Sequence, residues 1–374
     1  GTTTFSGALT LGGAFAFTGQ NLTLGAAGHT VGTGMTVTNA GTFTTGDSAD
    51  LTVGGSFLQN GAGSSSLGGD LTGSSGLTFR RGIELTGSDA VTLATGGADN
   101  EDLLLGTAGA VTNVAGTGQD LILDAGSAGD LTVRGALGRV DAPLGAVTFA
   151  QADHALLTGI LSAASWTQSN ASATGQTTLA GTVRLTGNLA FTGQDLTLSG
   201  SENEVGGTVV VTNAGTWTME DSADLTVTGA ISQQGAGAVL LGADLTSTTA
   251  GISFAKAVTL DSTDTIRLAT GGGADDDLSL GATLGANADE SLTVDLGAGG
   301  DLVLTGAVTL GSGTLTITNA ADTTFSSTIT AGAFMQAAGT GTTTFGGALD
   351  LGGDFAFTGQ ALTLTGSGHD IDGS

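Results

Sequence analysis

The sequence predicts an all-β, rod-like fold: a parallel β-solenoid of roughly 18 coils with about 20 residues in each coil. Three observations support this prediction. Short segments that alternate apolar residues with Thr or Ser follow one another every six to ten residues. Turns rich in Gly, Asn and Asp separate them, in a chain of 374 residues that contains 68 glycines. Long stretches return later in almost the same order, as a repeat architecture requires.

The strand pattern is clearest near the amino terminus, where successive segments read ALTL, AFAF, NLTL, MTVT, TFTT, DLTV and SFLQ. Alternation places Leu, Val, Ile and Phe on the inner face of each strand and Thr, Ser and Asp on the outer wall. No stretch of about 10–12 residues has the 3.6-residue apolar period of a helix. A βαβ fold therefore has no candidate crossover helices.

Internal repeats organise the chain on a longer scale. Residues 1–24 and 341–364 are identical at 20 of 24 positions, with an offset of 340. AFTGQNLTL at Ala16–Leu24 returns as AFTGQDLTL at Ala190–Leu198, with an offset of 174. Because neither end shows a distinct capping coil, we expect these 374 residues to be one segment of a longer array. The predicted organisation is one continuous solenoid segment, 1–374, with internal repeats at 7–180 and 181–346 and the start of a third at 347–374.

Composition and charge exclude several classes of protein. The chain has 34 acidic and 7 basic residues, a net charge of -27 at pH 7. So few cations cannot neutralise a phosphate backbone, so we expect no nucleic-acid partner. No apolar run reaches the length of about 18 residues that a membrane helix needs, so we expect no membrane insertion. The absence of cysteine excludes thiolate catalysis and is compatible with export.

Several segments resemble the β-strand repeats of giant bacterial filamentous-haemagglutinin-like surface exoproteins. They include AASWTQSNASATGQTTLAG, DLILDAGSAGDLTV and AGAFMQAAGTGTTTFGGALDLGGDFAFTGQALTL, and the resemblance covers essentially the whole chain. It implies a right-handed parallel β-helix that is secreted and forms a fibre or adhesive stalk at the cell surface. The implied partners are further copies in an array or filament, and glycans or neighbouring cell surfaces. The resemblance supplies no catalytic residues.

Two acidic turns, GGADNEDLLLG and GGGADDDLSLG, occupy corresponding places in the two repeats. Calcium takes six to eight oxygen ligands, which closely spaced carboxylates and the carbonyls of a Gly-rich turn supply. Both strings lack the tandem nine-residue period of calcium-binding β-rolls, so solvated acidic turns are the competing interpretation. The candidate calcium ligands are Asp99, Glu101, Asp102, Asp275, Asp276 and Asp277.

Two further polar patterns recur. Asn39, Asn213 and Asn319 follow Thr in TNA sequences, where we expect left-handed turn residues whose amides bond to nearby backbone. Four large apolar residues each precede a Gln by two positions, and we expect them to be core anchors. These anchors are Phe57, Trp166, Ile231 and Phe334.

The sequence does not predict a catalytic site. His29 and His369 occupy the same repeat position, and His154 stands alone without a visible nucleophile partner. The two repeats diverge at 134–159, which makes this segment the best place to look for a specific site. An insertion loop on a solenoid is the alternative. The divergent segment contains Arg134, Arg139, Asp141, Asp153 and His154.

These observations predict a non-enzymatic, extracellular structural segment of a bacterial surface fibre, sheath or adhesive stalk, which self-associates or adheres as a rigid rod. A specific glycan-binding or cell-binding adhesin is the alternative, and saturable binding would distinguish it. Ice binding through outward threonines such as Thr36 and Thr38 is a further alternative, although Thr-Xaa-Thr units do not recur at every coil. A β-helical polysaccharide lyase or glycosidase is disfavoured because the acidic clusters are themselves repeated.

Overall fold

A computed structural model confirms the predicted fold class. Parallel strands stack in about 17 turns of roughly 21 residues, slightly fewer and longer turns than predicted, and the described residues form no helix. The described part of the chain accordingly offers no helix capable of crossing a membrane. The structure describes residues 1–374 apart from 99–100, 108–109, 112–113, 117, 170–174 and 374.

The chain divides into two compact units, Gly1–Gln194 and Asp195–Ser374. Within the described residues, the first unit contains 25 strands. They are β1 (Thr2–Phe5), β2 (Thr10–Leu11), β3 (Phe15–Gly19), β4 (Asn21–Leu24), β5 (His29–Val31), β6 (Met35–Asn39), β7 (Phe43–Thr45), β8 (Leu51–Val53), β9 (Phe57–Gln59), β10 (Ser65–Leu67), β11 (Leu71–Gly73), β12 (Leu77–Phe79), β13 (Ile83–Leu85), β14 (Val91–Thr95), β15 (Leu103–Thr107), β16 (Ala110–Val111), β17 (Val114–Ala115), β18 (Leu121–Asp124), β19 (Leu131–Val133), β20 (Leu144–Gln151), β21 (Ala155–Leu157), β22 (Leu161–Gln168), β23 (Gln176–Leu179), β24 (Val183–Leu185) and β25 (Leu189–Gly193).

The second unit contains the other 25 strands. They are β26 (Asp195–Leu198), β27 (Asn203–Val205), β28 (Val209–Asn213), β29 (Trp217–Met219), β30 (Leu225–Val227), β31 (Ile231–Gln233), β32 (Val239–Leu241), β33 (Leu245–Ser247), β34 (Ile252–Phe254), β35 (Val258–Leu260), β36 (Ile266–Ala269), β37 (Leu278–Leu280), β38 (Leu284–Ala286), β39 (Leu292–Asp295), β40 (Leu302–Leu304), β41 (Val308–Thr309), β42 (Thr314–Asn319), β43 (Thr323–Phe325), β44 (Ile329–Ala331), β45 (Ala333–Gln336), β46 (Thr342–Phe345), β47 (Leu349–Leu351), β48 (Phe355–Phe357), β49 (Ala361–Leu364) and β50 (Asp370–Ile371).

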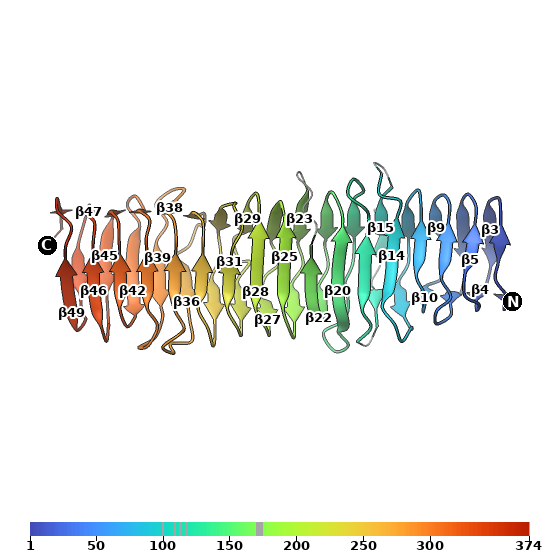
Figure 1. The fold of residues 1–374 in the computed structure, drawn as a ribbon, viewed down its shortest axis with the longest axis horizontal. Coiled ribbons are helices and arrows are strands. Elements are labelled where there is room, and N and C mark those ends of the chain that lie inside the picture. Colours follow the sequence, from blue (N-terminus) through green and yellow to red (C-terminus); the bar gives the residue numbers. More distant parts are fainter. Residues whose placement is uncertain (99–100, 108–109, 112–113, 117, 170–174, 374) are drawn as a thin grey trace. The chain divides into compact units, whose positions relative to one another are not determined.

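Three strands make up a regular turn, and each strand pairs in parallel with the strand three places further along the chain. In the first unit β1 pairs with β4, and β4 pairs with β7. In the second unit β31 pairs with β34, and β34 pairs with β37. Within each unit of Figure 1, equivalent strands of successive turns therefore lie side by side. Backbone hydrogen bonds between turns satisfy the donors and acceptors that an isolated turn would expose.

The first unit becomes irregular where the two sequence repeats diverge. There β20 and β22 are eight residues long, whereas the other described strands of the unit have two to five residues, and β20 pairs with β22 in parallel. Arg139 and Ala142 form an antiparallel bridge within the connection that precedes β20. The predicted insertion is therefore a local rearrangement of two turns that keeps the parallel stacking.

Strand residues alternate between buried and outward positions, as the sequence pattern predicts. The four predicted anchors are core residues, each no more than 1% exposed. Aromatic rings from neighbouring turns pack against one another, with centroids 5.1 Å apart for Phe57 and Phe79 and 5.4 Å apart for Phe334 and Phe355. Full burial of a side chain such as Phe57 contributes about 1.5–3 kcal/mol, so the inward residues hold successive turns together.

The repeated asparagines are not left-handed turn residues, so that prediction was wrong. Among the described non-glycine residues, only Ser48, Glu202 and Ser222 have a positive φ. Asn39 and Asn213 instead end strands β6 and β28 and are buried. A side chain that bonds to its neighbours from an extended backbone needs no left-handed conformation.

The asparagine amides form a buried polar stack with the glutamines of the next turn. Asn39 Nδ2 donates to the Gly41 carbonyl at 2.8 Å, and Gln59 Nε2 donates to Asn39 Oδ1 at 2.8 Å. In the second unit Gln233 Nε2 donates to Asn213 Oδ1 at 2.7 Å. Side-chain amides thus satisfy one another and the adjacent backbone inside the solenoid.

Outward threonines form a single-file rank on the first unit. Thr10, Thr30, Thr52 and Thr72 are register partners on four consecutive turns, and the first three are exposed. The rank ends at Ala94 on the following turn. This rank therefore extends over four turns and is one residue wide.

Candidate functional site

Aspartates that immediately precede a strand form the dominant polar feature of both units. In the first unit Asp50 Oδ1 accepts the backbone N–H of Asp70 at 3.0 Å. Asp70 Oδ1 in turn accepts the backbone N–H of Thr92 at 2.7 Å. Each carboxylate therefore bonds to the start of the equivalent strand one turn further along.

The same arrangement recurs in the second unit. Asp224 Oδ1 accepts the N–H of Asp244 at 3.0 Å, and Asp244 Oδ1 accepts the N–H of Arg267 at 2.7 Å. Burial raises the pKa of the Asp244 carboxyl, the Arg267 N–H partly opposes this, and repulsion from Asp224 adds to it. These aspartates link successive turns by hydrogen bonds. The sequence does not reveal this role, because the role depends on the register between turns.

The first predicted calcium turn lies partly within the described residues; Asp99 lies outside them. Glu101 Oε2 accepts the backbone N–H of Ala98 at 2.7 Å, which closes its own turn. Asp102 Oδ1 accepts the N–H of Asp130 at 3.1 Å on the next turn. Both described carboxylates therefore hold backbone groups in place.

The second predicted calcium turn has the same arrangement. Asp276 is buried and accepts the backbone N–H of Gly273 at 2.8 Å, whereas Asp275 is exposed. Asp277 Oδ1 accepts the N–H of Asp301 at 2.8 Å. Among the described residues of these two turns, no three carboxylate side chains place their oxygens within 4.8 Å of one another. Calcium binding at these turns stays a prediction.

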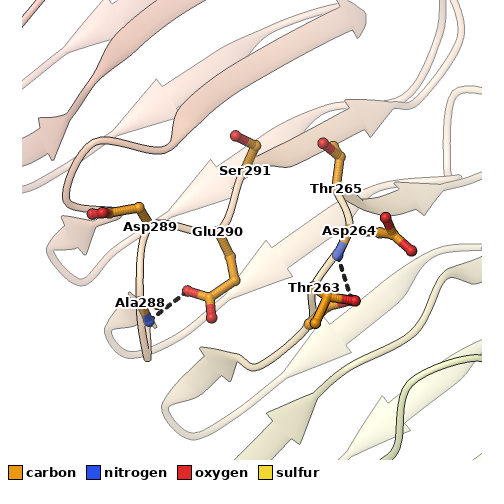
Figure 2. A pocket seen from close by; sticks show the side chains of 8 residues that line it. Thr263, Asp264, Thr265, Ala288, Asp289, Glu290 and Ser291 are labelled. Carbon is orange, nitrogen blue, oxygen red and sulfur yellow. Dashed lines mark hydrogen bonds between the residues drawn. The ribbon is translucent and has the colours of Figure 1, made fainter.

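The second unit carries an acidic depression between two turns, shown in Figure 2. The turns 262–265 and 288–291 line a pocket of about 440 Å³. Glu290 Oε2 accepts the N–H of Ala288 at 2.8 Å, and Asp264 N–H donates to Ser262 Oγ at 3.2 Å. A neighbouring depression of about 280 Å³ shares the first turn. This face is concave and negatively charged.

The acidic pocket is lined by only a few kinds of chemical group. Its lining consists of carboxylates, hydroxyls and Ala288, without an imidazole or amine that would activate a nucleophile. Asp289 Oδ1 accepts the N–H of Ser312 at 2.8 Å, and hydrogen bonds from Ser312 lower the pKa of its carboxyl. Sequence reasoning did not single out Asp264, Asp289 or Glu290. The arrangement can attract cations, and it disfavours anionic ligands.

The divergent segment brings together groups that the sequence leaves apart. His154 Nδ1 lies 3.3 Å from Asp130 Oδ1 and 3.2 Å from Asp153 Oδ2. Arg139 forms a bidentate ion pair with Asp141, in which Nε donates to Oδ1 at 2.9 Å and Nη2 donates to Oδ2 at 2.8 Å. Both side chains are exposed. His154 stands alone in the sequence because its partner Asp130 precedes it by 24 residues, which is one turn of the solenoid.

The two repeated histidines support backbone groups. His29 is buried, and its Nδ1 accepts the N–H of Leu9 at 3.0 Å. His369 Nδ1 accepts the N–H of Leu349 at 3.2 Å. Burial lowers the pKa of His29, and a hydrogen bond to the Ala26 backbone partly opposes this shift. Both contacts are those of a structural residue.

Comparisons of the chain with protein-family models, curated proteins and solved structures found no match.

Proposed function

We propose that the chain is a non-enzymatic structural segment of a long extracellular bacterial fibre, sheath or adhesive stalk. It would act as a stiff element whose turns are joined by backbone ladders, an apolar interior and aligned aspartates. Its partners would be further copies in an array, with glycans or neighbouring cell surfaces as the contacts of an adhesive form.

One observation carries this proposal: repeated polar side chains are engaged in holding turns together. Asp50 and Asp224 bond to the next turn in the same way, and so do the Asn39–Gln59 and Asn213–Gln233 amide pairs. A catalytic site needs polar groups that converge on a substrate. In the described residues these repeated groups converge on backbone N–H and C=O groups instead.

Ice binding remains a second candidate because of the threonine rank Thr10–Thr30–Thr52–Thr72. Thermal hysteresis of the purified chain decides between the two. A structural segment gives none, whereas an ice-binding protein gives hysteresis that Thr30→Lys reduces. Thr265→Lys is the matched control, since Thr265 is exposed, belongs to the other unit and lies outside the strands.

The extracellular location is tested with antibodies against residues 1–374 on intact and permeabilised producing cells. We expect equal labelling of both, with loss of the signal after brief protease treatment of intact cells. Labelling that requires permeabilisation would contradict the proposal. Saturable binding of the purified chain to a glycan array would favour the adhesive form over a purely structural one.

A further inference from the structure

We propose that Asp130, Asp153 and His154 form a binding site for a divalent transition-metal ion such as Zn²⁺. All three residues belong to the first unit. Asp130 immediately precedes β19, and His154 immediately precedes β21, which pairs with β19 so that Leu131 faces Ala155. The stacking of turns therefore sets His154 directly over Asp130, and Asp153 reaches the same point from the neighbouring position.

The spacing of the ligand atoms fits a metal ion. One donor atom from each of the three side chains lies within 4.8 Å of the others. His154 Nδ1 is 3.3 Å from Asp130 Oδ1 and 3.2 Å from Asp153 Oδ2. A tetrahedral ion with bonds of about 2.1 Å holds neighbouring ligand atoms about 3.4 Å apart.

A simple ion pair accounts less well for this geometry. Charge-assisted N–H···O hydrogen bonds are about 2.7–2.9 Å long, as in the Arg139–Asp141 pair at 2.9 and 2.8 Å. The single Nδ1 proton of a histidine cannot point at two carboxylates at once. An ion shared by one imidazole nitrogen and two carboxylate oxygens bonds to all three.

The ligand set indicates which ions fit. Imidazole nitrogen with carboxylate oxygen suits Zn²⁺ and related ions, whereas Ca²⁺ takes oxygen ligands. The His154 and Asp130 side chains are 54% and 52% exposed, and Asp153 is 27% exposed. Water therefore reaches the open side of the cluster and can complete the coordination.

The second unit supplies an internal comparison. Asp322 N–H donates to Asp301 Oδ1 at 2.9 Å, as His154 N–H donates to Asp130 Oδ1 at 3.2 Å. Asp322 thus stands where the first unit has His154, and Ala321 stands in the place of Asp153. The shared backbone arrangement does not require a histidine, so His154 and Asp153 are additions specific to one turn.

Isothermal titration of the full chain with Zn²⁺ tests the proposal. We expect one Zn²⁺ site per chain. The affinity for Zn²⁺ should fall by about tenfold or more in His154→Asp and in Asp153→Ala, because losing even a residue that supports a metal ligand typically lowers affinity 10–100-fold. His29→Asn is the control, because it removes a histidine that lies outside the cluster. It introduces asparagine, the residue at the equivalent position of the second repeat (Asn203), and should leave the site intact. Circular dichroism confirms that each variant is folded.

A gain-of-site variant makes the test two-sided. Ala321→Asp combined with Asp322→His should raise the stoichiometry to two Zn²⁺ ions per chain. X-ray absorption at the zinc edge should show one histidine nitrogen at about 2.0–2.1 Å with oxygen ligands in the wild type. Equal binding by wild type and His154→Asp, or weak binding of many ions that high salt abolishes, would overturn the proposal.

Discussion

At the scale of single residues, side-chain oxygens that would be candidate ligands in the sequence act as acceptors for backbone N–H groups. Asp277 is an example, because its Oδ1 accepts the N–H of Asp301 one turn further along. Carboxylates in this position resemble helix caps in function, since each satisfies a donor at the start of a regular element.

Asp277→Ala should therefore lower the free energy of unfolding by about 1–2 kcal/mol. Asp275→Ala, two positions earlier and exposed, should change it by less than about 0.5 kcal/mol. Asp277→Asn should retain part of the stability because the amide oxygen still accepts the hydrogen bond. Urea denaturation of the three variants measures the difference, and equal effects of the two alanine variants would contradict the capping role.

His29 should make stability depend on pH. Burial lowers its pKa in the folded chain below the unfolded value of about 6.5. The unfolded chain then binds protons more readily, so stability is full above about pH 6.5 and falls as the pH drops toward the folded pKa. Nδ1 also accepts the Leu9 N–H, a bond that protonation at Nδ1 removes.

Thermal melting at pH 7.5 and pH 5.5 checks this prediction. Between the two pH values, the melting temperature of the wild type should fall more than that of His29→Asn. This variant carries the residue of the equivalent position in the second repeat, Asn203. Since all other titratable groups are common to both proteins, the difference isolates His29. Parallel pH profiles would show that His29 does not contribute.

At the scale of elements, each three-residue strand is too short to be stable alone, and stability comes from stacking. The amide stack is part of this, because Gln233 bonds to Asn213 Oδ1 and its own Oε1 accepts the N–H of Lys256 at 3.2 Å. One side chain thus joins three successive turns.

Gln233→Leu should destabilise the second unit by about 2–4 kcal/mol, because it leaves buried polar partners unsatisfied. Gln234→Leu is the matched control, since Gln234 is the next residue and is exposed. Hydrogen exchange should show faster exchange confined to β28, β31 and β34 in the first variant. A neutral effect of Gln233→Leu would show that the amide stack is not stabilising.

The elements that sequence reasoning predicted well are those encoded by local alternation. Leu225–Val227 reads LTV and is a strand with two buried ends, and Trp166 is a core anchor. Contacts between turns were harder to predict, because the number of residues between equivalent positions varies from turn to turn. Asp102 bonds 28 residues ahead to Asp130, whereas Asp130 bonds 24 residues ahead to His154. Without the register, the His154 cluster and the aspartate ladder could not be inferred.

At the scale of the whole molecule, the net charge of -27 is the dominant property. Aligned carboxylates on successive turns repel one another, and screening should relieve that repulsion. Raising NaCl from about 10 mM to about 150 mM shortens the Debye length from about 30 Å to about 8 Å and should raise the melting temperature. A melting temperature independent of salt would contradict this account.

Calcium provides a separate comparison at matched ionic strength. If the acidic turns bind calcium, CaCl₂ should stabilise the chain more than MgCl₂, since Mg²⁺ is the more reluctant of the two to shed its water. Asp275→Asn should then remove part of the difference, because Asp275 is the exposed carboxylate of its turn. Equal stabilisation by the two ions would contradict calcium binding at the acidic turns.

The proposed structural role concerns an assembly, so the assembly is the object to measure. Electron microscopy of material released from producing cells, labelled with gold-conjugated antibodies against residues 1–374, tests it most directly. We predict gold particles along extended filaments, at regular axial intervals if the chain repeats in a longer array. Gold confined to compact, isolated particles without filaments would contradict a role as a fibre segment.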